Sequence, residues 1–222
     1  MKKNNATWLF DGDNNWPASS ESFWTTLFAF FALHLSNIGA LTNHLTVWQC
    51  TDGTDNKWFE RRKSSTTLEL SNLSFNSIAI EPRDLLKIQW PGILSSKEGG
   101  FSPDIVIKTR KAGSVHFIII ENKVTTNARL AGNQLENYPR LMNWLNDKKV
   151  SFDFLLLQSV GNNNYNLLEN ARELQKNHKQ FGILLWEEVL RVMNNTKFAP
   201  LGLPIESWQD YTGALDTDCD TA

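Results

Sequence analysis

The sequence predicts a single mixed α/β domain in which helices flank a central mixed sheet. Two β-branched runs, 103–109 and 115–123, flank a short connection that contains Gly113, which is the pattern of a β-hairpin. A continuous apolar run at 152–158 is typical of a strand that is buried on both faces. Helical segments precede, separate and follow these strands, which indicates helices packed on a sheet. We expect these helices at 19–35, 129–147 and 167–178.

The composition is that of a globular protein. At 222 residues the chain fits one domain, 1–222, and its 41% hydrophobic content, with 9 Trp and 13 Phe, suffices for a sizeable core. The net charge of −2 excludes a global basic field, so a nucleic-acid ligand would need a local patch. Cys50 and Cys219 match no metal-ligand spacing, and no apolar run is long enough to span a bilayer. We therefore expect a cytoplasmic protein with reduced thiols.

The first helix follows an irregular arm. Residues 1–18 are polar and rich in turn-forming residues. Ser19 and Ser20 supply a cap and Glu21 an acidic first turn, so the helix should begin there and continue to residue 35. Because this helix is apolar nearly all round, we expect it to be largely buried.

The segment between the first helix and the hairpin is less regular. Short strands are expected at 45–50, 66–70 and 77–80, and one of the last two should be the first strand of the core sheet. The loop at 88–102, rich in Pro and Gly, leads directly into the hairpin. A loop in this position is suited to substrate contacts or to a lid.

The C-terminal half alternates helices and strands. Pro139 should kink the helix at 129–147 or begin a second segment. The last predicted strand and helix follow the helix at 167–178, and residues 200–222 form a peripheral segment with an acidic tail. That strand is expected at 181–186 and that helix at 187–194.

The hairpin carries the candidate site. A turn centred on Ala112 and Gly113 places Asp104 directly opposite Glu121, with Cβ atoms ~5 Å apart on one face. Lys123 joins that face because strand side chains alternate. Two facing carboxylates would repel each other, so a shared divalent cation is the natural third partner, and the ammonium can hold or deprotonate a water molecule. The pattern therefore indicates a hydrolytic site.

These residues resemble a known family. Pro103-Asp104, an apolar strand and Glu121-Asn122-Lys123 at its end are similar to the signature of the PD-(D/E)XK nuclease superfamily, which has the restriction-endonuclease-like fold. The order of the predicted elements fits the αβββαβ core of that fold. Two other Asp-x-Lys triplets, 55–57 and 147–149, follow no apolar strand. An ordinary buried hairpin with a surface ion pair is the alternative interpretation.

The resemblance implies a nuclease that depends on Mg²⁺ (or Mn²⁺) and hydrolyses phosphodiester bonds, most often in DNA. Asp104, Glu121 and the backbone carbonyl of Asn122 would bind the metal. Lys123 would position or activate the attacking water. Many nucleases of this fold cut duplexes as dimers, so the resemblance leaves a homodimer open.

Three further positions have both a functional and a structural interpretation. Glu21, in Glu21-x-x-x-Thr25, resembles an acidic residue that completes the metal site in many members, but it is equally a favourable charge at a helix N-terminus. Gln134 and Tyr138 lie four residues apart and resemble the Gln-x-x-x-Tyr element of RecB-like members. This pair would support the lysine or contact the nucleic-acid backbone. The alternative is a polar helix start with a half-buried Tyr138.

A basic cluster is the candidate nucleic-acid contact. The densest basic cluster is formed by Lys57, Arg61, Arg62 and Lys63, with Trp58 and Phe59 interleaved. Cations interleaved with aromatic side chains suit phosphate contacts and base stacking. A solvated surface loop is the simpler interpretation of the same residues.

Two other functions stay open because a fold does not fix its function. One is a non-catalytic nucleic-acid-binding or assembly subunit in a restriction, repair or defence system, which the acidic pI favours. The other is a metal-dependent hydrolase of a small phosphoester. His116 lies on the strand face opposite Glu121 and is expected to be a packed histidine rather than a ligand.

Overall fold

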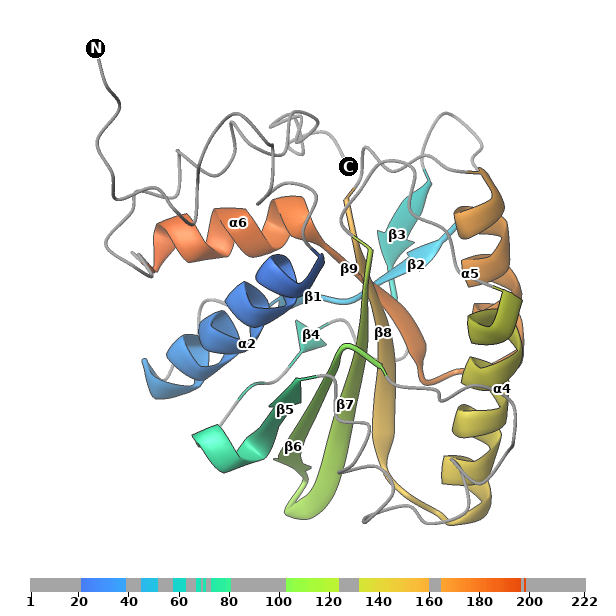
Figure 1. Cartoon of the computed structure of the whole chain (residues 1–222), viewed down its shortest axis with the longest axis horizontal. Helices are drawn as coiled ribbons and strands as arrows, with labels where there is room; N and C mark the ends of the chain where they lie inside the picture. The colour runs from blue at the N-terminus through green and yellow to red at the C-terminus, as the bar shows by residue number, and fades with distance from the viewer. Residues whose placement is uncertain are drawn as a thin grey trace.

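The predicted mixed α/β fold class is confirmed. A computed structural model describes residues 21–38, 45–51, 58–62, 67, 68, 70, 73–80, 103–123, 132–159, 165–196 and 198. These residues form a seven-stranded mixed sheet with helices on both faces and a separate two-stranded sheet (Figure 1). The strand order of the large sheet is β3-β2-β9-β8-β7-β6-β5.

The elements have the following bounds. The helices are α2 (Glu21–Asn37), α4 (Gly132–Asp147), α5 (Tyr165–Asn177) and α6 (Trp186–Asn195), with a short 3-10 turn at Phe75–Ser77. The strands are β1 (Leu45–Thr46), β2 (Trp48–Cys50), β3 (Phe59–Arg61), β4 (Thr67–Leu68), β5 (Ile78–Ile80), β6 (Ile105–Lys111), β7 (Ser114–Lys123), β8 (Phe152–Gln158) and β9 (Phe181–Leu185).

The centre of the large sheet is parallel. Strands β7, β8 and β9 pair in parallel, with α4 and α5 as the connecting helices, and the pairs on either side of this centre are antiparallel. Every residue of β8 and β9 is buried. The apolar run at 152–158 is therefore the buried strand that its sequence predicts, since helices cover both faces of a parallel sheet.

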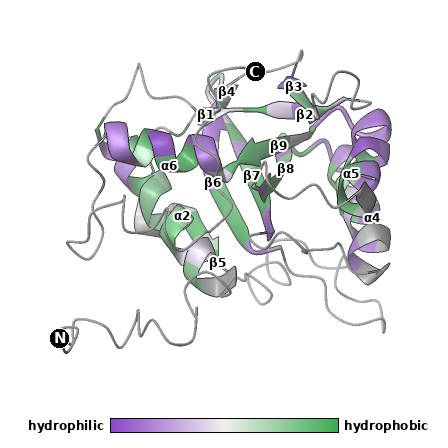
Figure 2. Cartoon of the chain, turned by 90° about the horizontal axis from the view of Figure 1, so that it is seen from above, coloured by the Kyte–Doolittle hydropathy of each residue, from purple (hydrophilic) through white to green (hydrophobic). Residues whose placement is uncertain are grey.

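The helices form a layer on each face of the sheet. Helices α2 and α6 share one hydrophobic cluster with Ile118 and Ile120 of β7, whereas α4 and α5 share another with Ile119. Successive strand residues point to opposite faces, which is why neighbouring isoleucines enter different clusters. Figure 2 shows the sheet and much of α2 as hydrophobic, while α5 carries many hydrophilic residues. The burial of α2 agrees with its apolar sequence.

The predicted hairpin is present with the predicted register. Strands β6 and β7 pair from Ile105 opposite Ile120 to Lys111 opposite Ser114. The turn residues Ala112 and Gly113 have φ angles of 51° and 82°. Positive φ at both central residues is what a type I′ hairpin turn requires.

The N-terminal strands differ from the prediction. The run at 45–50 forms two strands, because the chain leaves β4 after Thr46 and joins β9 and β3 from Trp48. Strand β4 belongs to the small sheet, so β5, which pairs with β6, is the first strand of the αβββαβ order. The N–H of Arg62 donates to the carbonyl of Val47 at the break between the two strands.

Two details of the helices also differ from the prediction. Helix α4 continues through Pro139, so Pro139 does not begin a second segment. Proline inside a helix costs roughly 3 kcal/mol, and the burial of Tyr138, Met142 and Leu145 on the sheet offsets this cost. Trp186 begins α6 instead of ending the last strand.

Several predicted segments lie outside the described residues. They are the arm at 1–18, the loop at 88–102 and the segment at 200–222. Among the described helices, none is long and apolar enough to cross a membrane.

Candidate active site

Glu121 and Lys123 lie side by side at the carboxyl end of β7. Lys123 Nζ is 2.8 Å from Glu121 Oε1. Glu121 is 1% exposed and Lys123 is 6% exposed. An ion pair that is this sheltered experiences little screening by solvent, so each charge depends strongly on the other.

Gln134 in the first turns of α4 completes this contact. Its Nε2 donates a hydrogen bond of 2.6 Å to Glu121 Oε1, the same oxygen that binds Lys123. Because both donors reach Oε1, the carboxylate of Glu121 has a fixed orientation beneath α4. Gln134 thus connects the start of α4 to β7.

Asp104 lies in the bend immediately before β6. Its Oδ2 accepts a hydrogen bond of 2.6 Å from the backbone N–H of Asn122. Since Ile105 pairs with Ile120, the next position of the ladder places Asp104 beside Glu121. Hydrogen bonding from a backbone N–H stabilises the charged form of a carboxylate.

Asn122 points to the opposite face of the sheet. Its Nδ2 donates to Thr25 Oγ1 at 3.1 Å, and its Oδ1 accepts from Trp186 Nε1 at 3.0 Å. All three residues are buried, so this bridge connects β7 to α2 and α6 next to the Glu121–Lys123 pair. The sequence singled out Thr25 only as part of the Glu21 pattern; α2 begins at Glu21, whose side chain lies outside the described part of the chain.

Gln158 is a polar residue of this region that sequence reasoning missed. It ends β8, pairs with Lys123 in the sheet and is 0% exposed. The available signal was its position: a polar residue closes the apolar run at 152–158, at the carboxyl edge of a parallel sheet, where α/β proteins place their binding residues.

The proposed nucleic-acid contacts do not gather at this site. Tyr138 is 1% exposed, and its ring packs against Phe154 with centroids 4.9 Å apart. The Tyr138 ring is therefore a core element, and it presents no stacking surface in this structure. Arg61 is exposed on β3, an edge strand, and Lys63 lies outside the described residues.

Arg62 belongs to a separate ion-pair cluster around Asp153, at the other end of the sheet. Arg62 Nη2 is 2.8 Å from Asp153 Oδ1, and Lys111 Nζ and His116 Nε2 lie 3.3 and 3.1 Å from Asp153 Oδ2. Asp153 lies five residues before Gln158 on β8, which is roughly 16 Å of extended strand, and on the opposite face. Arg62 therefore acts in the structure as a buried ion-pair partner, and the expectation that His116 is a packed histidine agrees with its burial.

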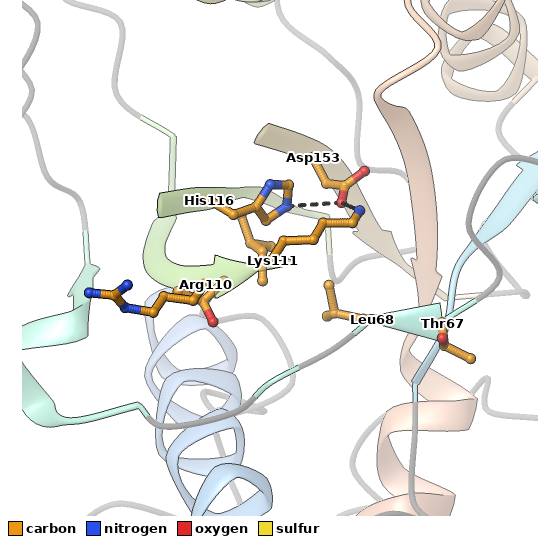
Figure 3. A pocket seen from close by; sticks show the side chains of 8 residues that line it. Thr67, Leu68, Arg110, Lys111, His116 and Asp153 are labelled. Carbon is orange, nitrogen blue, oxygen red and sulfur yellow. Dashed lines mark hydrogen bonds and ion pairs between the residues drawn. The ribbon is translucent and has the colours of Figure 1, made fainter. Parts of the chain in front are cut away.

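A small pocket lies beside Asp153. Figure 3 shows His116 and Lys111 directed toward Asp153, while the side chain of Arg110 extends away from it. Burial by itself would raise the pKa of the Asp153 carboxyl, but the hydrogen bond from His116 and the charges of Arg62 and Lys111 outweigh it and hold that pKa well below its ordinary value. The negative charge of Asp153 is thus stabilised by side chains of the same protein, without a ligand.

The donor set at the hairpin suits a hard divalent cation. Mg²⁺ and Mn²⁺ prefer oxygen ligands and are commonly held by one or two carboxylates with water. Asp104, in the bend before β6, and Glu121, on the adjacent strand β7, supply two carboxylates. Within the described ranges no three His, Cys, Asp or Glu side chains come together.

The chain was compared with models of known protein families, with curated proteins and with solved structures, and nothing matched in any of the three comparisons.

Proposed function

We propose that the protein is a metal-dependent nuclease that hydrolyses phosphodiester bonds, with DNA as its substrate. The observation that carries this proposal is the contact of Lys123 and Gln134 with one oxygen of Glu121, next to Asp104. A sheltered ammonium beside two carboxylates, at the carboxyl end of parallel strands, is suited to hydrolysis at a phosphate.

Each residue has a distinct role in this proposal. Asp104, Glu121 and the backbone carbonyl of Asn122 would hold Mg²⁺ or Mn²⁺, which would supply positive charge against the charge that builds on the scissile phosphate. Gln134 would orient the Glu121 carboxylate toward the cation through the hydrogen bond to Oε1. Lys123 positions the attacking water.

The burial of the pair sets a condition on access. Glu121 and Lys123 are 1% and 6% exposed, so a phosphodiester reaches them only when the covering chain moves aside. Closure of a site over its substrate excludes water and strengthens the electrostatic interactions inside it. This proposal therefore includes an opening step before substrate binds.

The test is cleavage of single-stranded and double-stranded DNA by the purified protein with Mg²⁺ or Mn²⁺. We expect cutting that EDTA abolishes and that Lys123→Ala abolishes while metal binding, measured by calorimetry, is kept. Lys108→Ala is the matched control, because Lys108 is an exposed lysine on the neighbouring strand β6. Cleavage by Lys123→Ala at the wild-type rate would contradict the proposal.

The second candidate is a non-catalytic nucleic-acid-binding or assembly subunit. The observation that favours it is the burial of Glu121 and Lys123, because a protein without catalytic activity does not need to admit a substrate to these residues. No cutting under any metal condition, together with DNA binding that weakens as salt is raised, would support this function instead.

A further inference from the structure

The side-chain amide of Gln158 has no hydrogen-bond partner among the described residues. The residue is 0% exposed, and neither Oε1 nor Nε2 has a hydrogen-bond partner within the part of the protein that the structure describes. A glutamine amide has two donor hydrogens and an acceptor oxygen. Buried polar groups are almost always hydrogen-bonded, so an amide with neither end matched requires an explanation.

The position of Gln158 in the sheet limits which groups can hydrogen-bond its amide. In the sheet Gln158 pairs with Lys123 of β7 on one side and with Leu185 of β9 on the other. Neighbouring strands lie ~4.8 Å apart, and residues paired in register point to the same face. Leu185 is apolar, so Lys123 is the polar side chain beside Gln158 across the strands.

The energetics disfavour a purely structural role. A buried polar group without a partner costs about 1–3 kcal/mol relative to a matched one, whereas an apolar side chain of the same shape carries no such cost. The rest of β8 before Gln158 is mostly apolar and fully buried. A leucine or methionine would therefore pack at this position with less cost, which indicates that the amide serves a ligand.

A water molecule is the ligand that fits. Buried waters typically bind about three polar groups that would otherwise be unmatched. Complete burial of Gln158 favours a single water over a nucleotide phosphate, since a phosphodiester cannot touch a 0% exposed amide without repacking of the site.

We propose that Gln158 holds a water molecule together with Lys123, and that this water is the one that attacks the phosphodiester. This inference rests on the proposed nuclease function. The water donates one hydrogen to Gln158 Oε1 and accepts a hydrogen bond from Lys123 Nζ, which leaves a lone pair for phosphorus. In the hydrolysis the water oxygen bonds to phosphorus, one ester P–O bond breaks, and a proton of the water ends on the departing oxygen.

The first test compares Gln158→Met with wild type in cleavage rate, DNA affinity and thermal stability. We expect kcat to fall by roughly 10²-fold, the cost of a misplaced reactant, with KM unchanged and Tm unchanged or raised. Loss of kcat without loss of stability is a result that a merely structural role would not give. Gln180→Met is the matched control, because the Gln180 amide bonds Asn146 at the surface.

The second test separates this inference from the proposed function. A crystal structure of the wild-type protein should show a water within hydrogen-bond distance of the Gln158 amide and Lys123 Nζ, and Gln158→Met should lack it. If wild type cuts DNA and Gln158→Met cuts equally fast, the inference fails and the nuclease stands. If the wild-type protein does not cut DNA, the proposed nuclease function is wrong, and so is the proposed role of this water as the nucleophile. If the crystal structure shows no water at the Gln158 amide, or shows the amide hydrogen-bonded to another residue of the protein, the proposed water site is wrong.

Discussion

Lys123 and Glu121 form an ion pair of 2.8 Å between residues that are two positions apart on one strand. Alternation of strand side chains puts them on the same face, beneath α4, where both are almost fully sheltered. Removing two charges from water costs several kcal/mol per ion, and only the partner charge offsets this cost. The pair should therefore behave as a unit in any mutational test.

Removing the charge of Lys123 alone should lower the free energy of unfolding more than removing the charges of both Lys123 and Glu121. Lys123→Met leaves the Glu121 carboxylate buried without its cation, and we expect it to lower the free energy of unfolding by roughly 3–5 kcal/mol. Adding Glu121→Gln removes the uncompensated charge and should recover part of that loss. Urea unfolding of the two single variants and the double variant measures this coupling. Strict additivity of the three values would show that the two charges do not interact.

Gln134 should stabilise the orientation of Glu121. Gln134→Leu removes a hydrogen bond of 2.6 Å to a buried carboxylate, and hydrogen bonds to charged groups contribute about 1.5–3 kcal/mol. We expect a loss of stability in this range and slower DNA cleavage. Asn143→Leu is the matched control on the same helix, because Asn143 is exposed. Equal behaviour of the two variants would contradict a role for Gln134 at the site.

The hairpin was predictable because its determinants are local. Two β-branched runs and a two-residue turn fix the register, and the register fixes which side chains share a face. Asp104, Glu121 and Lys123 therefore follow from the sequence around Gly113, and their relative placement agrees with the structure.

The remaining features depend on contacts that are distant in sequence. Gln158 comes near Lys123 only because β8 pairs in parallel with β7, and nothing in either segment specifies that register locally. Arg62 and Asp153 are 91 residues apart, so the basic cluster gave no sign that Arg62 has a buried partner. Tyr138 has a polar sequence context but packs on Phe154. Tertiary packing decided each of these cases, and local patterns do not encode it.

Asp153 should make stability sensitive to acid. Its pKa in the folded protein lies well below the ordinary value of 3.8, so folding favours the charged carboxylate. The resulting stabilisation is fully present above about pH 4 and is lost as the pH falls through the folded pKa. Asp153→Asn should therefore be clearly less stable than wild type at pH 7, and the difference should shrink below about pH 4. Urea unfolding at pH 7, 5, 4 and 3 measures it; a difference that does not change with pH would refute the assignment.

Cys50 should be unreactive in the folded protein. Burial raises the pKa of its thiol to about 12, against a smaller opposing effect of the Arg172 charge. The reactive thiolate is therefore almost absent at neutral pH. In a Cys219→Ser chain, Cys50 is the one remaining thiol, and we expect iodoacetamide to modify it only after unfolding in urea. Rapid modification of the native protein at pH 7 would show that the thiol is accessible.

The hairpin turn offers a stabilising substitution. Ala112 has a φ of 51°, in the left-handed region that costs most non-glycine residues roughly 1–2 kcal/mol. Asparagine tolerates this region and is favoured before glycine in type I′ turns, so Ala112→Asn should raise the free energy of unfolding by roughly 0.5–1 kcal/mol.

The neighbouring position supplies a control of opposite sign. Gly113 has a φ of 82°, and a Cβ built there meets nothing within 4 Å. Gly113→Ala should therefore be destabilising through backbone conformation alone, without any steric clash. Urea unfolding of both variants measures the two effects. Because the same turn sets the register that brings Asp104 beside Glu121, a destabilised Ala112→Asn or a neutral Gly113→Ala would contradict the turn on which the candidate site depends.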